Sequence, residues 1–276
     1  MHRNAQVLFF LIAFFLSSFS AFAKNVTVLS WNIQHFGRTK SLETLEFIAK
    51  TVQDYDIIAI QEVVGKTGGV EAVQKLVGIL KTWDSEANWS YAISPITSGN
   101  PHESERYAYI WKAAELQRVG EVFLYQKRAN EIVREPYFAS FVSEKDTFTL
   151  VNFHAVPKFK NPESEIKYFK FMPDEFPNMN LIFLGDFNTP QSNNVFNPLK
   201  KMGYLPALIN QKTTVRMQCK NGDCLASEYD NIFYPSKKIK KIRSGVIHYY
   251  KEYPDAKTAR SKVSDHIPVY LEFSFK

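Results

Sequence analysis

The sequence predicts a single α/β domain with a thick, sheet-rich core. Segments with apolar residues at helical spacing alternate with short apolar runs that are typical of buried strands. The 276 residues are enough for one large core or two small ones, and no Gly/Ser-rich or Pro-rich linker or internal repeat divides them. Aromatic residues are abundant, with 23 Phe and 14 Tyr, which favours one large core. We therefore expect residues 24–276 to form one domain.

The first half of this domain reads as alternating strands and helices. Strands are predicted at residues 26–31 and 57–60, and the helix between them, residues 41–53, has apolar residues at helical spacing. A second amphipathic helix spans residues 70–80. Strands at 89–94 and 106–111 follow, separated by a loop rich in Ser, Pro, Gly and Asn over 94–104.

The second half contains further strands and two shorter helical segments. Helices are predicted at residues 162–171 and 193–202. The predicted strands lie at residues 148–153, 181–184, 213–218, 229–234 and 267–275.

Residues 1–23 have the features of a secretory signal peptide. His2 and Arg3 precede an apolar run over residues 7–15, and Ala21-Phe22-Ala23 has the A-x-A form of a cleavage site. The alternative is a membrane anchor, but the uncharged span is short and no stop-transfer pattern follows it. We expect a secreted protein, or a periplasmic one in a Gram-negative bacterium, without a stable membrane anchor.

The charge balance favours an anionic partner. The formal net charge is +6, which suits nucleic acid or an anionic membrane surface. One basic cluster could contact phosphates, although a solvated loop is the simpler interpretation. Its members are Lys237, Lys238, Lys240, Lys241 and Arg243.

The two cysteines predict a local disulfide. Cys219 and Cys224 flank Asn221-Gly222, and Asn-Gly is the strongest short hairpin signal. In an exported protein, a cysteine pair across such a turn favours a disulfide bond. A zinc site would need two further ligands at suitable spacing, which the sequence does not offer.

One apolar run, residues 181–184, ends abruptly at Gly185, Asp186 and Asn188. If the extended backbone continues, the side chains of Asp186 and Asn188 point the same way and can hold one ligand together. The alternative is a buried strand followed by an Asx-turn.

Polar side chains stand at the ends of most other predicted strands as well. Each has an ordinary explanation: Glu62 as a surface carboxylate, His154 as a core histidine, Asp265 as a cap or turn residue. Together they fit metal-assisted phosphodiester hydrolysis, because carboxylate and amide oxygens suit Mg²⁺ or Mn²⁺ and histidines transfer protons near neutral pH. The full set is Asn32, Glu62, Glu105, His154, Asp186, Asn188, Asp230, Asp265 and His266.

The order of these groups resembles the endonuclease/exonuclease/phosphatase superfamily, and within it most closely the secreted deoxyribonuclease I branch. The resemblance covers roughly residues 26–273 and implies a four-layer α/β sandwich. In that fold two mixed sheets pack face to face, helices lie outside, and the site lies at one edge. The motifs that carry it are Trp31-Asn32-Ile33, Gln61-Glu62-Val63, Glu105-Arg106-Tyr107, Phe153-His154, Gly185-Asp186-Phe187-Asn188, Tyr229-Asp230-Asn231-Ile232 and Ser264-Asp265-His266-Ile267-Pro268.

The resemblance also implies a role for each site residue. Glu62 would be the principal ligand of Mg²⁺ or Mn²⁺, assisted by Asn32 and Asp265, with Ca²⁺ as a further candidate ion. Two pairs, His154 with Glu105 and His266 with Asp230, would act as acid and base. Asp186 would orient the attacking water or join the metal ligands, and Asn188 and Arg106 would hold a phosphate oxygen.

The function expected from this resemblance is a monomeric, secreted, metal-dependent endonuclease. It would cleave DNA, with RNA as an alternative substrate, show little sequence preference and leave 5′-phosphate ends. The alternatives are a sphingomyelin phosphodiesterase, a phosphoinositide phosphatase and a nuclease-like subunit of a toxin assembly.

The chain also departs from the deoxyribonuclease I branch at two places. Val64 stands where the branch has an arginine that enters the minor groove, and Thr189-Pro190 replaces the cysteine that follows the Asp-x-Asn motif. Sphingomyelinases commonly carry an exposed aromatic hairpin, for which Phe36 and Tyr249-Tyr250 are only weak candidates.

Overall fold

The structure is a computed structural model that describes residues 24–99 and 104–276, so the predicted signal peptide lies outside the described residues. Two six-stranded sheets form the frame, with strand orders β13-β14-β1-β2-β4-β3 and β5-β6-β7-β8-β12-β9. Both sheets are mixed, because β1 pairs in parallel with β2, and β7 in parallel with β8, while the other pairs are antiparallel. A separate two-stranded sheet joins β10 and β11.

The strands have the following bounds: β1 (Val26–Phe36), β2 (Ile57–Val64), β3 (Trp89–Ile93), β4 (Glu105–Lys112), β5 (Gln117–Leu124), β6 (Tyr137–Ser143), β7 (Asp146–His154), β8 (Leu181–Asp186), β9 (Tyr204–Pro206), β10 (Val215–Lys220), β11 (Asp223–Leu225), β12 (Asp230–Pro235), β13 (Ile239–Val246) and β14 (Val269–Phe275). The helices are α1 (Leu42–Val52), α2 (Thr67–Trp83), α3 (Glu163–Ile166), α4 (Met172–Glu175), α5 (Asn197–Lys201) and α6 (Ala256–Lys262), joined by the short 3₁₀ turns η1 (Gln126–Arg128), η2 (Lys158–Lys160), η3 (Phe169–Phe171), η4 (Asn194–Phe196) and η5 (Tyr249–Glu252).

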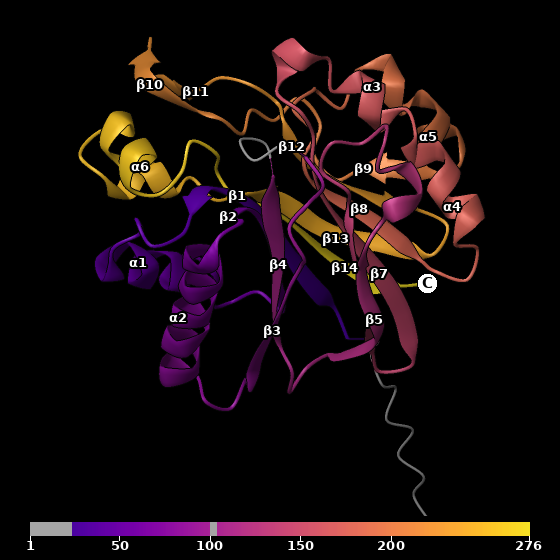
Figure 1. Cartoon of the computed structure of the whole chain (residues 1–276), viewed down its shortest axis with the longest axis horizontal. Coiled ribbons are helices and arrows are strands. Elements are labelled where there is room, and N and C mark those ends of the chain that lie inside the picture. The colour runs from indigo at the N-terminus through magenta and orange to yellow at the C-terminus, as the bar shows by residue number, and fades with distance from the viewer. Residues whose placement is uncertain (1–23, 100–103) are drawn as a thin grey trace, which may run out of the picture.

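Three buried clusters show that the elements form four layers, as predicted. The middle cluster draws side chains from both sheets, including Val28 and Tyr109 from one and Phe148 and Leu184 from the other. The sheets therefore pack face to face. A second cluster lies between the first sheet and α1, α2 and α6, and a third lies between the other sheet and α3 to α5. Figure 1 shows the two groups of helices on opposite sides of the sheets.

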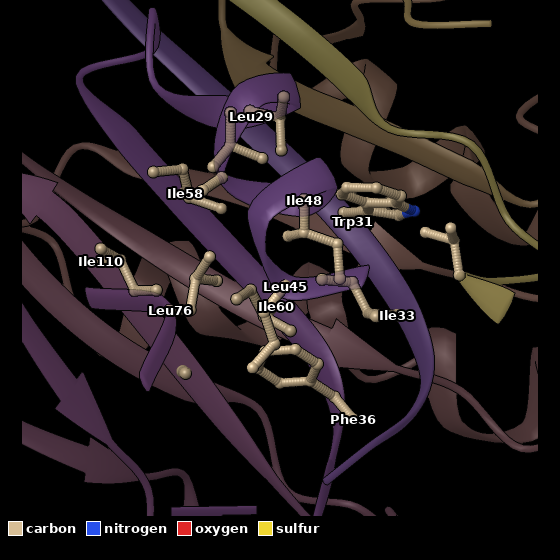
Figure 2. Close-up of a cluster of buried hydrophobic side chains, with 14 of the residues drawn as sticks. Leu29, Trp31, Ile33, Phe36, Leu45, Ile48, Ile58, Ile60, Leu76 and Ile110 are labelled. Atoms are coloured by element: carbon tan, nitrogen blue, oxygen red, sulfur yellow. The ribbon is translucent and has the colours of Figure 1, made fainter. Parts of the chain in front are cut away.

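Central strand β1 is buried on both faces and so supplies side chains to two of these clusters. Leu29 and Trp31 contact the helical side, where Leu45 and Ile48 of α1 meet them, as Figure 2 shows. Val28, on the opposite face, joins the core between the sheets. Such burial explains why the strand reads as a nearly continuous apolar run.

The first two predicted helices are confirmed. The α1 helix begins after Ser41, whose Oγ accepts a hydrogen bond from the Thr44 backbone N–H at 3.2 Å, a standard N-cap. Its buried face consists of Leu45, Ile48 and other residues at helical spacing. The second predicted helix is α2.

The later predicted helices are broken into shorter pieces. Over residues 162–171 the structure has α3 and η3, because the buried side chains Ile166, Phe169 and Met172 recur every three residues, which is the period of a 3₁₀ helix. Over residues 193–202, η4 precedes α5, in whose first turn Pro198 lies. Proline has no N–H for an interior helical hydrogen bond, so one continuous helix cannot run through it.

The basic cluster near the C-terminus lies partly on a strand, so the solvated-loop interpretation is wrong for those residues. Lys240, Lys241 and Arg243 are exposed on β13, which pairs with β14 alone at the edge of its sheet. Arg243 forms an ion pair with Glu272 on that neighbour. Exposed charges along an edge strand oppose pairing with another chain, which gives the cluster a structural reason.

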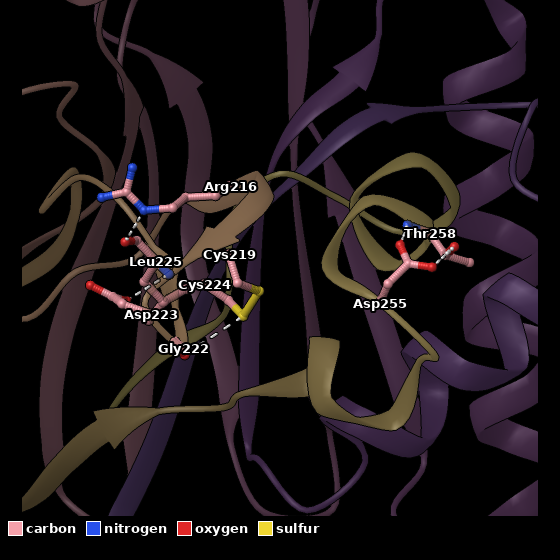
Figure 3. The surroundings of a disulfide bond; sticks show 8 residues. All are labelled: Arg216, Cys219, Gly222, Asp223, Cys224, Leu225, Asp255 and Thr258. Atoms are coloured by element: carbon pink, nitrogen blue, oxygen red, sulfur yellow. Dashed lines mark hydrogen bonds between the residues drawn. A yellow bond between two sulfur atoms is a disulfide. The ribbon is translucent and has the colours of Figure 1, made fainter.

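The predicted disulfide is present in the structure. Cys219 and Cys224 are bonded across the β10–β11 hairpin, shown in Figure 3. Asn221 and Gly222 have φ values of 51° and 79°, as a two-residue hairpin turn of the primed type requires.

Neither weak candidate for an aromatic membrane contact is available. Phe36 and Tyr249 are buried, with exposed fractions of 0% and 2%, and Tyr250 packs partly against the same core. Among the described residues, no helix is both long and apolar enough to cross a bilayer.

Candidate active site

Strand ends bring three predicted site residues together at one edge of the second sheet. In the parallel pair β7–β8, His154 lies opposite Asp186, and in the antiparallel pair β8–β12 Asp230 lies opposite the same residue. Asp186 is therefore the middle of three adjacent positions.

His154 and Glu105 form one predicted pair. The Nδ1 atom of His154 lies 2.9 Å and 3.1 Å from the two carboxylate oxygens of Glu105, and both side chains are buried. Burial and the neighbouring Arg134 lower the pKa of His154, but Glu105 outweighs them and raises it above its usual value. Burial conversely raises the pKa of Glu105, whereas His154 and Arg134 hold it below its ordinary value.

His266 and Asp230 form the other pair. His266 Nδ1 lies 2.7 Å from Asp230 Oδ2, and the hydroxyl of Thr213 donates to the same oxygen at 2.6 Å. Burial raises the pKa of Asp230 to about 6 despite the opposing effect of His266. Burial lowers the pKa of His266, but Asp230 and Asp186 outweigh it and raise this pKa well above its usual value.

The two pairs converge on Asp186. The Nε2 atoms of His154 and His266 each lie 3.5 Å from Asp186 Oδ2, which also accepts a hydrogen bond from Asn32 Nδ2 at 3.0 Å. Burial raises the pKa of Asp186, but the two histidines outweigh it and hold the pKa below its ordinary value. Two proton-carrying rings and a carboxylate thus face one point.

The sequence left two interpretations of the segment after β8: an Asx-turn, or an extended backbone with Asp186 and Asn188 at one ligand. The structure has features of both. The backbone N–H of Asn188 donates to Asp186 Oδ1 at 2.9 Å, which closes an Asx-turn, and Asn188 has a φ of 49°. The extended backbone therefore ends at Asp186. Asn188 nevertheless stays at the site, because its Nδ2 donates to the Ala155 carbonyl, one residue after His154, at 3.0 Å.

Glu62 reaches the site through an irregularity in β2. It has a φ of 60°, rare for a residue other than glycine, and the β2–β4 register shifts between Ile60 and Val63. The Glu62 N–H donates to Glu105 Oε1 at 3.1 Å, and its carboxylate accepts from the His35 N–H at 3.0 Å. This bulge redirects the carboxylate toward the edge where the other groups collect.

The predicted metal ligands fit a hard divalent cation. Asn32 Oδ1 and Asp265 Oδ1 are buried oxygens without a hydrogen-bond partner, which an ion would satisfy. Burial lowers the pKa of the partly buried Lys40 ammonium to about 8, against the opposing charges of Glu62 and Asp265.

A second group of potential ligands lies beside the first. Asp186, Asp230 and His266 each offer one ligand atom, and these atoms lie within 4.8 Å of one another. The Nδ1 atom of His266 is bonded to Asp230, so its ring would offer the Nε2 atom to a cation. Asp230 Oδ1 is also a buried oxygen without a hydrogen-bond partner, so this group is a second candidate metal site, joined to the predicted set by the hydrogen bond from Asn32 to Asp186.

Arg134 was missed in the sequence although it touches the first pair. Its guanidinium donates to Glu105 Oε2 at 3.1 Å and to the carbonyls of His154 and Ala155 at 3.0 Å and 2.5 Å. It also lines a cavity of about 710 Å³ beside Glu62 and Glu105. Arg134 precedes a strand that the sequence analysis did not identify, so no strand end drew attention to it.

Arg106 occupies a different environment from the one expected of a phosphate ligand. Its Nε donates to the Gly65 carbonyl at 3.0 Å and its Nη1 to the Ser94 carbonyl at 2.7 Å. These bonds tie β4 to two neighbouring loops. Its contact with a substrate phosphate stays a prediction.

The His154–Glu105 pair makes a pH prediction for the metal-free protein. Because Glu105 raises the pKa of His154, the stability this ring contributes is present below its unfolded pKa of about 6.5 and is lost as pH rises through the folded pKa. In Glu105→Gln the pKa of His154 should fall, since burial and Arg134 then act with less opposition. Proton NMR titration of the imidazole in EDTA measures this shift, and an unchanged titration would contradict the assigned cause.

Comparison with known proteins gives matches along most of the chain. The sequence model of the Endonuclease/Exonuclease/phosphatase family matches residues 29–266. A protein named deoxyribonuclease from Thioalkalivibrio sp. (strain K90mix) is 26% identical over 272 residues, covering 92% of this chain and 72% of the relative. Deoxyribonuclease-1 of Bos taurus is 27% identical over 176 residues, covering 59% of this chain and 61% of the relative.

Solved structures share the fold at low identity. An endonuclease/exonuclease/phosphatase family protein from Bacteroides thetaiotaomicron has a TM-score of 0.65 at 16% identity, with 92% of this chain and 99% of that chain covered. The catalytic domain of human Nocturnin has a TM-score of 0.64 at 14% identity, with 91% and 94% covered.

Proposed function

Because the chain belongs to the endonuclease/exonuclease/phosphatase family, we propose that it is a divalent-metal-dependent endonuclease that hydrolyses DNA. It would cleave with little sequence preference and leave 5′-phosphate ends. The observation that carries this proposal is the convergence of two His–carboxylate pairs on Asp186, beside buried oxygens that suit a cation. Such a site has the groups that phosphodiester hydrolysis requires.

Each residue then has a defined task. His154 and His266 hold and transfer protons at their Nε2 atoms, one accepting from water and the other donating to the leaving oxygen. Glu105 and Asp230 orient the rings from behind and stabilise the imidazolium form. Asp186 orients the attacking water between the two rings, and Asn188 holds the phosphate. Arg106 would assist only through the part of its guanidinium that does not bond to the Gly65 and Ser94 carbonyls.

Asn32, Glu62 and Asp265 would hold Mg²⁺ or Mn²⁺, with Ca²⁺ as a further candidate. When bound, the ion supplies positive charge to the phosphoryl oxygens. The chain's own contribution is to keep these ligands in place, as the Glu62 bulge and the hydrogen bond from Asn32 to Asp186 do.

DNA is the preferred substrate for two reasons. Both curated relatives described above are named deoxyribonucleases. The net charge of +6 also favours a polyanion, with RNA as the alternative.

We further propose that residues 1–23 direct export and that the mature protein, residues 24–276, acts as a monomer. N-terminal sequencing and size-exclusion chromatography of the exported form would test both points.

A plasmid-nicking assay tests the proposed function. Supercoiled plasmid should be nicked with Mg²⁺ or Mn²⁺ and remain intact in EDTA, and the ends should be ligatable 5′-phosphates. Sphingomyelin and a phosphoinositide, run in parallel, should be hydrolysed far more slowly. Preferential hydrolysis of either lipid, or nicking that persists in EDTA, would refute the proposal.

Binding to duplex DNA should weaken with salt by a log–log slope of about 0.9 per phosphate contact.

A further inference from the structure

One aromatic side chain on the turn that follows His154 is almost fully exposed. Phe159 has an exposed fraction of 84%, the largest of any large hydrophobic side chain in residues 24–99 and 104–276. Contact of such a ring with an apolar partner removes its surface from water, which is favourable. The exposed Phe159 ring is therefore a candidate for binding a ligand, and the residues around it support this role.

Phe159 lies on the 3₁₀ turn η2, which begins four positions after His154, at Lys158. The segment between them is fixed to the site, because the Ala155 carbonyl accepts the hydrogen bond from Asn188 Nδ2 at 3.0 Å. The next residue, Val156, donates its N–H to the buried carboxylate of Glu165 at 2.8 Å. The turn thus leaves directly from the edge where the histidines converge.

The turn itself is also held in shape. Lys158 forms an ion pair with Glu163 in α3 and lies 3.4 Å from the hydroxyl of Thr189, which follows Asn188. Within the turn, the Lys160 N–H donates to the Pro157 carbonyl at 2.8 Å. Figure 1 places α3, which follows this turn, at the top of the view, on the same side of the molecule as α4 and α5. Phe159 is accordingly presented on an ordered support.

We propose, on the basis of the function proposed above, that Phe159 stacks on an exposed base of the nucleic-acid strand held in the site. An exposed phenyl ring matches the apolar face of a base, because every base has a π-face on which an aromatic ring can stack. Phenylalanine has no hydrogen-bonding group with which to distinguish base edges, so the contact tolerates any sequence. The ring would contact bases that are unpaired or locally unstacked.

This chemistry favours a nucleic acid over a lipid bilayer. The turn, Pro157 to Asn161, offers one apolar ring flanked by charged side chains. A single ring matches one base, whereas anchoring in a bilayer requires a larger apolar face. The turn is also joined to the site by the contact of Lys158 with the hydroxyl of Thr189, the residue after Asn188.

Binding of short oligonucleotides tests the proposal. In EDTA, where cleavage is suppressed, Phe159→Ala should bind a fluorescein-labelled single-stranded 12-mer on the order of 5- to 100-fold more weakly than the wild type, while Phe159→Trp should retain the affinity. An abasic 12-mer, which keeps the phosphates and lacks the bases, should bind the wild type and Phe159→Ala equally. Stacking should also quench the added tryptophan fluorescence of Phe159→Trp.

A matched control is Trp83→Ala, which removes an aromatic ring with an exposed fraction of 47% at the C-terminal end of α2. It should leave oligonucleotide binding unchanged. Equal loss on the normal and abasic oligomers, or no loss in Phe159→Ala, would overturn the stacking role. So would Phe159-dependent binding to phosphatidylserine vesicles without an effect on oligonucleotides. A protein that nicks plasmid but shows these results refutes only the stacking contact, whereas one that nicks no nucleic acid refutes the proposed function.

Discussion

Replacing either His154 or His266 with alanine should lower the rate of plasmid cleavage at saturating Mg²⁺ by at least about 10²-fold, as loss of a general acid or base does. The structure gives the reason, because each ring presents Nε2 to the same point beside Asp186. His154 is the only histidine of β7, and His266, just before β14, has no other histidine near it in the chain that could replace it. Initial nicking rates of purified variants measure the effect.

The control for this experiment is stability. Both rings are buried, and their removal takes the histidine partner from Glu105 or Asp230, which keep Arg134 and Thr213, so the alanine variants should be folded but less stable. Urea unfolding and circular dichroism separate an inactive fold from an unfolded chain. A folded variant of either histidine that keeps near wild-type activity would refute its catalytic role.

The double variant adds a further check. If both histidines act on one phosphodiester around Asp186, their effects should not multiply, because loss of one proton-transfer group already disables the concerted step. The double variant should therefore be little slower than the more damaging single variant. Fully multiplicative losses would instead indicate two independent contributions.

The sequence predicted the fold most reliably where a strand or helix has one strong pattern. The long amphipathic helix α2 and the apolar strand β8 were identified because their periodicity is clear. Strands β5 and β6 were missed, since β5 is half exposed with an exposed Gly120, and β6 follows a segment of short turns. Their pairing with each other and with β7 is set by tertiary contacts, which a local pattern does not contain.

The site was predictable to the extent that its residues follow strands. Asp186 and His154 stand at strand ends, so their meeting follows from parallel pairing of β7 with β8. Thr213 and Arg134 lie outside that rule. The carbonyl of Thr213 accepts a hydrogen bond from the Ile267 N–H, which fixes the loop of Thr213 beside β12 and β14. The Thr213 hydroxyl can therefore reach Asp230. Both contacts join segments that are distant in the sequence.

Replacing Gly185 with alanine should disrupt the fold at the centre of the site and destabilise the protein by more than about 4 kcal/mol. A Cβ on this residue would lie 1.9 Å from the Phe153 carbonyl oxygen, and the residue has a φ of 136°. Gly185 pairs with Phe153 one position before Asp186 pairs with His154. Relief of the clash must move β8 away from β7, which also separates the catalytic groups.

Two other glycines serve as controls for Gly185→Ala. Comparison with them separates two contributions to the loss in free energy of unfolding: the backbone conformation and the steric clash. Gly120 has a φ of 66° but open space around its Cβ position, so Gly120→Ala should cost only about 1 kcal/mol, for the backbone conformation alone. Gly78 lies in the exposed face of α2 with open space, and Gly78→Ala should stabilise the protein by about 0.5–1 kcal/mol. Urea unfolding at equilibrium should rank the three variants in this order. A Gly185→Ala protein as stable as Gly120→Ala would show that β7 and β8 can separate freely. The close backbone contact between these strands would then not be the cause of the positions of His154 and Asp186.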